Sequence, residues 1–230
     1  MSDKAVKGER VLYGRRRGKP LRKGQQRLVS EDLPKLAISL DDDPIDLPSL
    51  FPENCSTYWM EIGFGGGEHL AWQAAANPDI GIIGCEPYLN GVATLLGKLE
   101  NNGAHNVRLH NEAAELLIKK LPASSLERAF ILFPDPWPKS GHNKRRFVSK
   151  LNIAALARVM KPGSELRIAT DHENYGAWIL WHMLRSTDFI WNTEDSEDWQ
   201  YRSPDWPPTR YEMKALENGL RPVYFRFHRR

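Results

Sequence analysis

A glycine-rich segment bordered by carboxylates carries the clearest chemical signal in the sequence. It reads EIGFGGG over residues 61–67, directly after an apolar run. Gly63 and Gly65 let the backbone approach a ligand closely, and the next helix can direct its N-terminus at the ligand's carboxylate. Glu61 would repel a pyrophosphate, and Glu68 occupies the place where a dinucleotide fingerprint needs a small residue. The pattern therefore favours S-adenosylmethionine, with its ammonium and sulfonium, over NAD.

Two more glutamates stand where apolar runs end. Glu86 closes the run at residues 80–85, where a carboxylate can accept hydrogen bonds from both ribose hydroxyls. Glu112 follows the run at residues 106–110, where adenine would lie. A lone glutamate is usually a solvated loop acid, but three acids at successive strand ends indicate one ligand site. We predict cofactor contacts for Glu61, Gly63, Gly65, Glu86 and Glu112.

A proline-framed acid follows the next apolar run, in the segment FPDPWPK at residues 133–139. Prolines prevent the strand from continuing. The segment therefore presents Asp135 beside an aromatic side chain, which resembles the motif with which amino- and base-methylating enzymes present the target atom. Residues 140–146 then bring three cations together, a composition that suits phosphate contacts. The alternative is a solvated helix N-terminus, where cations oppose the helix dipole at a cost of a few tenths to about 1 kcal/mol.

Strands and helices alternate along most of the chain. Apolar runs predict strands at residues 58–62, 80–85, 106–110, 129–133 and 166–169, with further strands near 189 and at 223–227. Apolar periodicity predicts helices at residues 68–76, 88–102, 113–121, 147–160 and 173–185. This order predicts an α/β fold with a doubly wound, mostly parallel Rossmann-like sheet, whose ligands bind at the carboxyl ends of the strands.

The charge distribution divides the chain. Residues 1–27 contain ten Lys and Arg against two acids, although the whole chain has a net charge of only +3. Residues 1–30 lack apolar periodicity, so we expect a basic, disordered tail before a single domain at residues 31–230. Such a tail suits a polyanionic partner, but a solvated tail without a partner explains it equally well. Residues 41–54, acidic and proline-rich, predict a loop, and residues 203–212 predict a stiff aromatic one.

Other protein classes find little support. No apolar run is long enough to span a bilayer and no signal peptide is evident. We therefore expect a cytoplasmic protein that does not associate with a membrane. Cys55 and Cys85 fit neither a metal knuckle nor a redox motif and predict two reduced thiols. The seven histidines are scattered, so no metal is assigned. No obligate protein partner is indicated.

Five motifs together resemble the bacterial tRNA (guanine-N7-)-methyltransferase family. They are EIGFGGG, CEP at 85–87, FPDPWPK followed by HNKRR, ATD at 169–171 and TRYE at 209–212, and the resemblance spans about residues 55–228. The family transfers a methyl group from S-adenosylmethionine to N7 of a guanine in the tRNA variable loop. The resemblance therefore implies the class I S-adenosylmethionine-dependent methyltransferase fold, with tRNA as the partner.

The resemblance also implies roles for individual residues. Asp135 would be the catalytic residue and would also contact the cofactor. Family members often have an aspartate where this chain has Glu112. Substrate contacts would come from Lys139, Asp171, Thr209, Arg210, Tyr211 and Glu212. RNA contacts would come from Gly141, His142, Asn143, Lys144, Arg145 and Arg146.

Competing functions remain open to different degrees. Glu61 and Glu68 argue against an NAD-dependent oxidoreductase, and a non-enzymatic RNA-binding module leaves the row of acids at strand ends unexplained. A methyltransferase that acts on another RNA position or on protein would share the cofactor half. Against this last alternative stand only the motifs FPDPWPK, HNKRR and TRYE.

Overall fold

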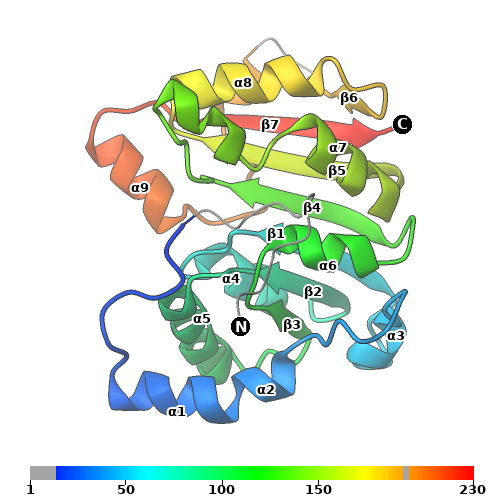
Figure 1. The fold of residues 1–230 in the computed structure, drawn as a ribbon, viewed down its shortest axis with the longest axis vertical. Coiled ribbons are helices and arrows are strands. Elements are labelled where there is room, and N and C mark those ends of the chain that lie inside the picture. Colours follow the sequence, from blue (N-terminus) through cyan, green and yellow to red (C-terminus); the bar gives the residue numbers. More distant parts are fainter. Residues whose placement is uncertain (1–13, 194–196) are drawn as a thin grey trace, which may run out of the picture.

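The computed structural model describes residues 14–193 and 197–230. Within these residues seven strands form one sheet in the order β3-β2-β1-β4-β5-β7-β6, which runs from bottom to top in Figure 1. The strands from β3 to β5 pair in parallel, whereas β7 pairs antiparallel with both β5 and β6. The predicted doubly wound, mostly parallel sheet is therefore confirmed.

The elements follow the predicted alternation closely. The strands are β1 Thr57–Ile62, β2 Ile80–Cys85, β3 Val107–His110, β4 Leu126–Leu132, β5 Met160–Thr170, β6 Phe189–Trp191 and β7 Val223–Arg229. The α-helices are α1 Lys23–Glu31, α2 Leu33–Leu36, α3 Leu47–Leu50, α4 Glu68–Ala76, α5 Leu89–Asn102, α6 Ala114–Lys120, α7 Lys150–Val159, α8 Glu173–Met183 and α9 Arg210–Glu217. Two 3₁₀ helices are η1 Ser140–Arg145 and η2 Asp198–Gln200.

Side-chain alternation in β1 decides what each face of the sheet receives. Met60 and Ile62 pack into the hydrophobic core shared with α6, α7 and α8. Trp59 packs into the opposite core, which is shared with α4 and α5. Because side chains alternate along a strand, Glu61 lies on the same face as Trp59 and so faces α4.

The predicted tail is wrong for residues 23–30, because Lys23–Glu31 forms helix α1. Leu28 of α1 is buried, and the helix packs against α5. The apolar residues of this segment form a short buried stripe on one side of the helix. Charged residues dominate the composition around it, so the stripe was not recognised in the sequence. The predicted boundary between residues 30 and 31 thus falls inside α1. Residues 14–22 form no helix or strand but contact α5, where the Gly18 N–H donates to Asn90 Oδ1 at 2.8 Å. The tail prediction for residues 1–13 lies outside the described residues.

Two predicted loops also contain helices. Residues 41–54 include the short helix α3. The loop predicted at residues 203–212 ends in α9, where Thr209 Oγ1 accepts a hydrogen bond from the Glu212 backbone N–H at 3.1 Å. The Glu212 carboxylate in turn accepts from the Thr209 N–H at 3.3 Å. This reciprocal pair is a capping box, which the spacing Thr-x-x-Glu could have predicted.

None of the helices in the described ranges has the length and apolar character needed to cross a membrane.

Candidate active site

A cavity of about 590 Å³ opens at the carboxyl ends of the parallel strands. This volume is within the range of pockets that hold a cofactor-sized ligand. The walls come from the ends of β1, β2 and β4, from the segments after β3 and β4, and from Gly14 and Arg15. The lining includes Gly63, Gly65, Glu86, Tyr88, Glu112, Glu115, Asp135, Trp137, Arg145 and Tyr211.

The glycine loop after β1 shapes one wall of the cavity. Gly67 has φ +70°, and a methyl group there would lie 2.6 Å from the Leu95 side chain of α5. Glycine therefore satisfies both the left-handed backbone and the close helix contact. A methyl group at Gly65 would lie 3.1 Å from the ring of Tyr211, so the loop and the start of α9 are in contact.

Glu86 is the best-anchored carboxylate in the cavity. Its Oε2 accepts a hydrogen bond from the Gly65 N–H at 2.8 Å, and its Oε1 accepts from the Tyr88 N–H at 2.9 Å. Burial raises the pKa of Glu86, the two N–H groups oppose that rise, and the carboxylates of Asp135 and Glu61 add to it. Each carboxylate oxygen keeps a lone pair for a ligand hydroxyl, so Glu86 fits the ribose of S-adenosylmethionine.

Glu61 does not line this cavity. Its carboxylate is buried on the α4 face of the sheet and lies 2.7 Å from Nδ1 of His69. It lines a smaller adjoining hollow, together with Gly63, Thr209 and Tyr211. Since Gly63 and Tyr211 border both spaces, Glu61 lies next to the cavity rather than inside it.

Glu112 stands exposed at the cavity rim, where residues near the N-terminus meet it. Nη2 of Arg16 lies 3.4 Å from Oε1 of Glu112. Gly14 and Arg15 line the cavity itself, and the Leu89 N–H donates to the Arg16 carbonyl at 3.0 Å. This arrangement was not predicted from the sequence, because the segment was expected to be a disordered tail.

Asp135 lies at the tip of a constrained loop. Phe133 has φ 50° and Trp137 has φ 44°, which is unusual for residues other than glycine, and prolines stand on both sides of Asp135. Strain of this kind persists where surrounding structure over-determines it, often at functional sites. The side chain is open to solvent on one side, while the cavity walls desolvate the carboxylate and raise the pKa of Asp135.

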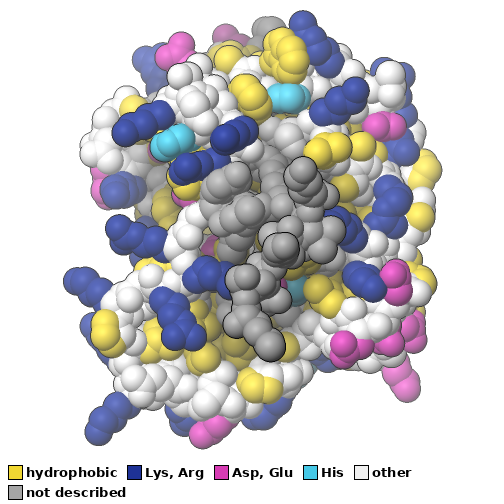
Figure 2. Space-filling view, in the orientation of Figure 1, with side chains coloured by type: hydrophobic (Ala, Val, Ile, Leu, Met, Phe, Trp, Pro, Cys, Tyr) yellow, Lys and Arg dark blue, Asp and Glu magenta, His cyan; other side chains and the backbone are white. Residues whose placement is uncertain are grey.

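The predicted basic segment folds as η1 and stacks on the loop that carries Asp135. The Arg145 guanidinium lies 4.9 Å from the centre of the Trp137 ring, and the His142 ring meets Trp137 edge-on at 6.1 Å. Desolvation and the nearby cations of Arg145, Lys139 and Lys144 lower the pKa of His142. Figure 2 shows Lys and Arg side chains along the side that carries α9 and α5, whereas Asp and Glu side chains gather near α3.

The predicted RNA contact of Arg146 does not fit its position, because the side chain is only 1% exposed. Its guanidinium donates to the Pro136 carbonyl at 2.8 Å and to Asn174 Oδ1 at 2.7 Å. The same group lies over the rings of Tyr175 and Trp178. Arg146 therefore ties the Asp135 loop to α8 and has no surface to offer a phosphate.

Of the six predicted substrate residues, Tyr211 alone is among the described residues that line the cavity. Tyr211 lines the cavity, and the exposed Arg210 lies over its ring at 5.5 Å. Thr209 and Glu212 are buried in the capping box. Lys139 and Asp171 are not among the residues that line the cavity.

Glu212 has further buried partners that explain its position. Its Oε1 accepts from Nε of Arg202 at 2.9 Å and from the Tyr224 hydroxyl at 2.8 Å. Burial, together with the acceptor Glu212, raises the pKa of Tyr224. The contribution of Glu212 is therefore to hold the start of α9 in place, so that Tyr211 can face the cavity.

Sequence reasoning missed Glu115, Tyr88 and Arg15, which also line the cavity. Tyr88 follows the CEP motif and could have been proposed from its place beside Glu86. Glu115 lies in the first turn of α6, a position where an acid is common because it interacts favourably with the helix dipole. In the described ranges, His, Cys, Asp and Glu form no group of three that could hold a metal ion. Cys55 and Cys85 are buried free thiols, and burial raises both pKa values.

Comparison with known proteins places the site in a family. Residues 56–224 match a family model described as a putative methyltransferase. A tRNA (guanine-N(7)-)-methyltransferase of Roseobacter denitrificans is 48% identical, with 98% of this chain and 99% of the relative covered. A relative of the same name from Rhodospirillum rubrum is 43% identical over 95% of this chain and 88% of its own.

The chain belongs to the tRNA (guanine-N7-)-methyltransferase family. The resemblance seen in the motifs is thereby confirmed, and so is the prediction of a methyltransferase that uses S-adenosylmethionine. Membership in the family sets aside the NAD-dependent oxidoreductase and the non-enzymatic module.

Solved structures agree with this methyltransferase family in fold. The 16S rRNA methyltransferase KamB superposes with a TM-score of 0.54 at 14% identity, covering 77% of this chain and 90% of KamB. An antibiotic-related methyltransferase superposes with a TM-score of 0.52 at 18% identity, covering 84% of this chain and 95% of its own. At such identities the likeness shows the fold alone, and it confirms the predicted Rossmann-like fold.

Proposed function

We propose that this enzyme methylates N7 of a guanine in the variable loop of tRNA, forming 7-methylguanosine. One observation carries the proposal: Trp137 joins the loop of Asp135 to the basic helix η1 at the mouth of the cavity that contains Glu86. A carboxylate that can bind a nucleobase and cations that can bind a phosphate backbone thus lie beside a cofactor site. The names of the relatives agree with this substrate.

The cofactor would be held by residues that already face one another. Glu86 would accept the ribose hydroxyls, and the backbone of the glycine loop would approach the amino-acid end of the ligand. Glu61 would interact with the ammonium group from the adjoining hollow, and Glu112 would lie near the adenine at the rim. When bound, S-adenosylmethionine supplies a methyl group on a positively charged sulfur.

The guanine would be selected and oriented by Asp135. A carboxylate can accept hydrogen bonds from the N1–H and the N2 amino group of guanine, whereas adenine has no matching donor pair. Guanine N7 carries a free lone pair and no proton, so no general base is needed. The base gains positive charge during methyl transfer, and a preorganised carboxylate stabilises that charge. Alignment and electrostatics are therefore the proposed sources of catalysis.

The RNA backbone would lie over η1 and the N-terminal arm. Lys144 is exposed on η1, and Lys139 is the residue directly before this helix. Arg15, Arg17 and Lys19 extend the cationic surface from the cavity toward α1. Cations that bind phosphates release counterions, so RNA affinity should fall with salt by a logarithmic slope of about 0.7–0.9 for each contact. With tRNA as the substrate, we place the reaction in the cytoplasm.

The remaining alternative is methylation of another RNA position or of protein. The decisive experiment incubates tRNA that lacks the modification with S-adenosylmethionine and the enzyme, then analyses nucleosides by mass spectrometry. A tRNA with adenine in place of the variable-loop guanine is the matched substrate control, and Asp135→Asn is the matched protein control. We expect 7-methylguanosine with the unaltered pair, none on the control tRNA, and formation about 10²–10³ times slower with Asp135→Asn. Its formation on the control tRNA would overturn the proposed position, and its absence throughout would overturn the proposed substrate.

A further inference from the structure

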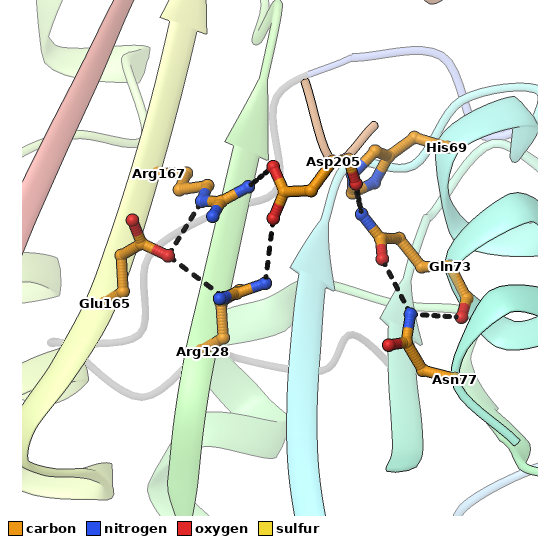
Figure 3. Close-up of polar contacts among 7 residues, drawn as sticks. All are labelled: His69, Gln73, Asn77, Arg128, Glu165, Arg167 and Asp205. Carbon is orange, nitrogen blue, oxygen red and sulfur yellow. Dashed lines mark hydrogen bonds and ion pairs between the residues drawn. The ribbon is translucent and has the colours of Figure 1, made fainter. Parts of the chain in front are cut away.

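A continuous chain of polar groups, buried from Glu61 to Gln73, joins the cofactor loop to the segment before α9. Glu61 Oε2 lies 2.7 Å from His69 Nδ1, and His69 Nε2 lies 3.1 Å from Gln73 Nε2. Gln73 Nε2 also donates to the Asp205 carbonyl oxygen at 3.1 Å. Figure 3 shows the part of this chain that runs from His69 to Asp205. Glu61, His69 and Gln73 are each at most 3% exposed, so water contributes little to these contacts.

The hydrogen atoms of the chain can be assigned from its partners. Gln73 Oε1 accepts from Asn77 Nδ2 at 3.0 Å, so the Gln73 amide must present its NH₂ group to His69 and Asp205. His69 Nε2 can then only accept, which places the ring proton on Nδ1, where it is donated to Glu61. Each member has one defined role, and a satisfied buried network of this kind specifies a single arrangement.

The Asp205 end is anchored by charges on the sheet. Arg167 Nη1 lies 2.7 Å from Asp205 Oδ1, and Arg128 Nη1 lies 3.4 Å from Oδ2. Glu165 Oε2 bridges the same two arginines at 2.8 and 3.0 Å (Figure 3). Desolvation alone would raise the pKa of Asp205, but the hydrogen bond and charge of Arg167, with Arg128, hold it below its usual value.

Packing transmits this anchor to the cavity. The His69 ring meets Phe130 at 4.6 Å and Trp206 at 5.2 Å, both edge-on. Trp206 is buried, and its carbonyl accepts a hydrogen bond from Arg202. Five residues after Trp206, Tyr211 reaches the cavity and lies against Gly65. The segment that carries Tyr211 is therefore fixed at its base to α4, the helix whose His69 contacts Glu61.

We propose that His69, Gln73 and Asp205 are positioning residues that couple the binding of S-adenosylmethionine to the binding of the RNA guanine. The chain keeps the Glu61 carboxylate and the segment 203–212 in one mutual arrangement. S-adenosylmethionine bound against Glu61 thereby stabilises the same arrangement that places Tyr211 at the cavity, and RNA bound against Tyr211 stabilises the arrangement of Glu61 in return. The inference rests on the proposed function, because it requires the cofactor and the RNA to occupy one cavity.

The central test interrupts the chain at Gln73. Gln73→Met has similar volume but can bond neither His69 nor the Asp205 carbonyl. The affinity for S-adenosylhomocysteine is measured by calorimetry with and without saturating tRNA. In the wild type we expect tRNA to tighten this affinity by at least about fivefold, with a reciprocal effect on tRNA affinity. Gln73→Met should bring that factor to near one, while the affinity for S-adenosylhomocysteine alone changes less than threefold.

The matched control is Glu127→Gln, which removes the exposed ion pair between Glu127 of β4 and Lys161 of β5. This control should keep the wild-type coupling. The inference is overturned if the wild type shows no coupling, or if Gln73→Met couples the two ligands as strongly as the wild type. Failure of the proposed function is seen separately, in wild-type protein that binds no S-adenosylhomocysteine or forms no 7-methylguanosine.

Two variants of His69 separate positioning from folding. The amide NH₂ of His69→Asn can stand in for Nδ1–H and keep the bond to Glu61, so cofactor affinity should survive while coupling is lost. In His69→Gln the amide NH₂ reaches the position of Nε2 instead of Nδ1, so the bond to Glu61 is lost. The affinity for S-adenosylhomocysteine should then fall about tenfold or more. Equal losses in both variants, in parallel with their melting temperatures, would make the chain merely structural and overturn the inference.

Discussion

The two sides of the cavity are built by different means. On the cofactor side, the backbone at the strand ends holds the Glu86 carboxylate with two N–H groups. On the substrate side, side chains stack one loop on another: Arg145 lies over Trp137, and Tyr211 lies against Gly65. Backbone at the end of a buried sheet is rigid, whereas stacked loops can adjust. This fold therefore preorganises the cofactor site and leaves the RNA side to packing between distant segments.

The largest expected effect is on the substrate side, at Asp135. Asp135→Asn keeps the shape of the side chain but removes its charge. Turnover of saturating tRNA should fall by about 10²–10³, the usual loss for a preorganised electrostatic group. Affinity for S-adenosylhomocysteine should fall by a smaller factor than turnover, because Asp135 is one of several residues that line the cofactor cavity. Single-turnover methylation and calorimetry measure the two quantities, and near-wild-type turnover would remove Asp135 from the mechanism.

The matching change on the cofactor side is Glu86→Gln. The amide NH₂ of glutamine would face one of the two backbone N–H donors that now reach the carboxylate. Affinity for S-adenosylhomocysteine should fall about 10- to 100-fold, as expected for hydrogen bonds to a charged group. Calorimetry tests this, with Glu112→Gln as the control at the exposed rim. Similar losses in the two variants would contradict the contrast between a buried anchor and a rim contact.

Neighbouring cations on the substrate side should behave differently from each other. Arg146→Met leaves the Pro136 carbonyl and Asn174 without their donor and should lower the free energy of unfolding by about 1–3 kcal/mol. Lys144→Gln, on the exposed surface, should change it by less than about 0.5 kcal/mol while raising the KM for tRNA. Chemical denaturation and steady-state kinetics measure both. A stable Arg146→Met protein with a raised KM would return Arg146 to the RNA surface.

The smallest expected effect concerns stability and pH. Burial raises the pKa of Asp135, so its ionised form is less favourable in the folded protein than in the unfolded chain. At pH 7 Asp135→Asn should therefore raise the free energy of unfolding, and with it the melting temperature. The gain should be at most about 1 kcal/mol, because solvent screens the exposed carboxylate. The gain should shrink as pH falls through the raised pKa toward the ordinary value of 3.8. A gain that grows toward acid pH would contradict the raised pKa.

The cofactor side was predictable because its signals are local. The limits of α4 and β2 agree with prediction to the residue, since apolar periodicity and flanking glycines are read directly from neighbouring positions. The substrate side was less predictable. The helix at Arg210–Glu217 was missed although its capping box is local, and α1 was missed because charged residues outnumber its short apolar stripe.

The sequence by itself determined the order of strands and helices, the glycine loop, the acids at the strand ends and the motifs that mark the family. Tertiary structure alone decided that Arg146 is buried, that Glu61 faces His69 rather than the cavity, and that Asp205 joins α4 to two strands. The physical reason is distance along the chain. Gln73 and Asp205 are 132 residues apart, and no local pattern can show that folding brings one amide to the other's carbonyl.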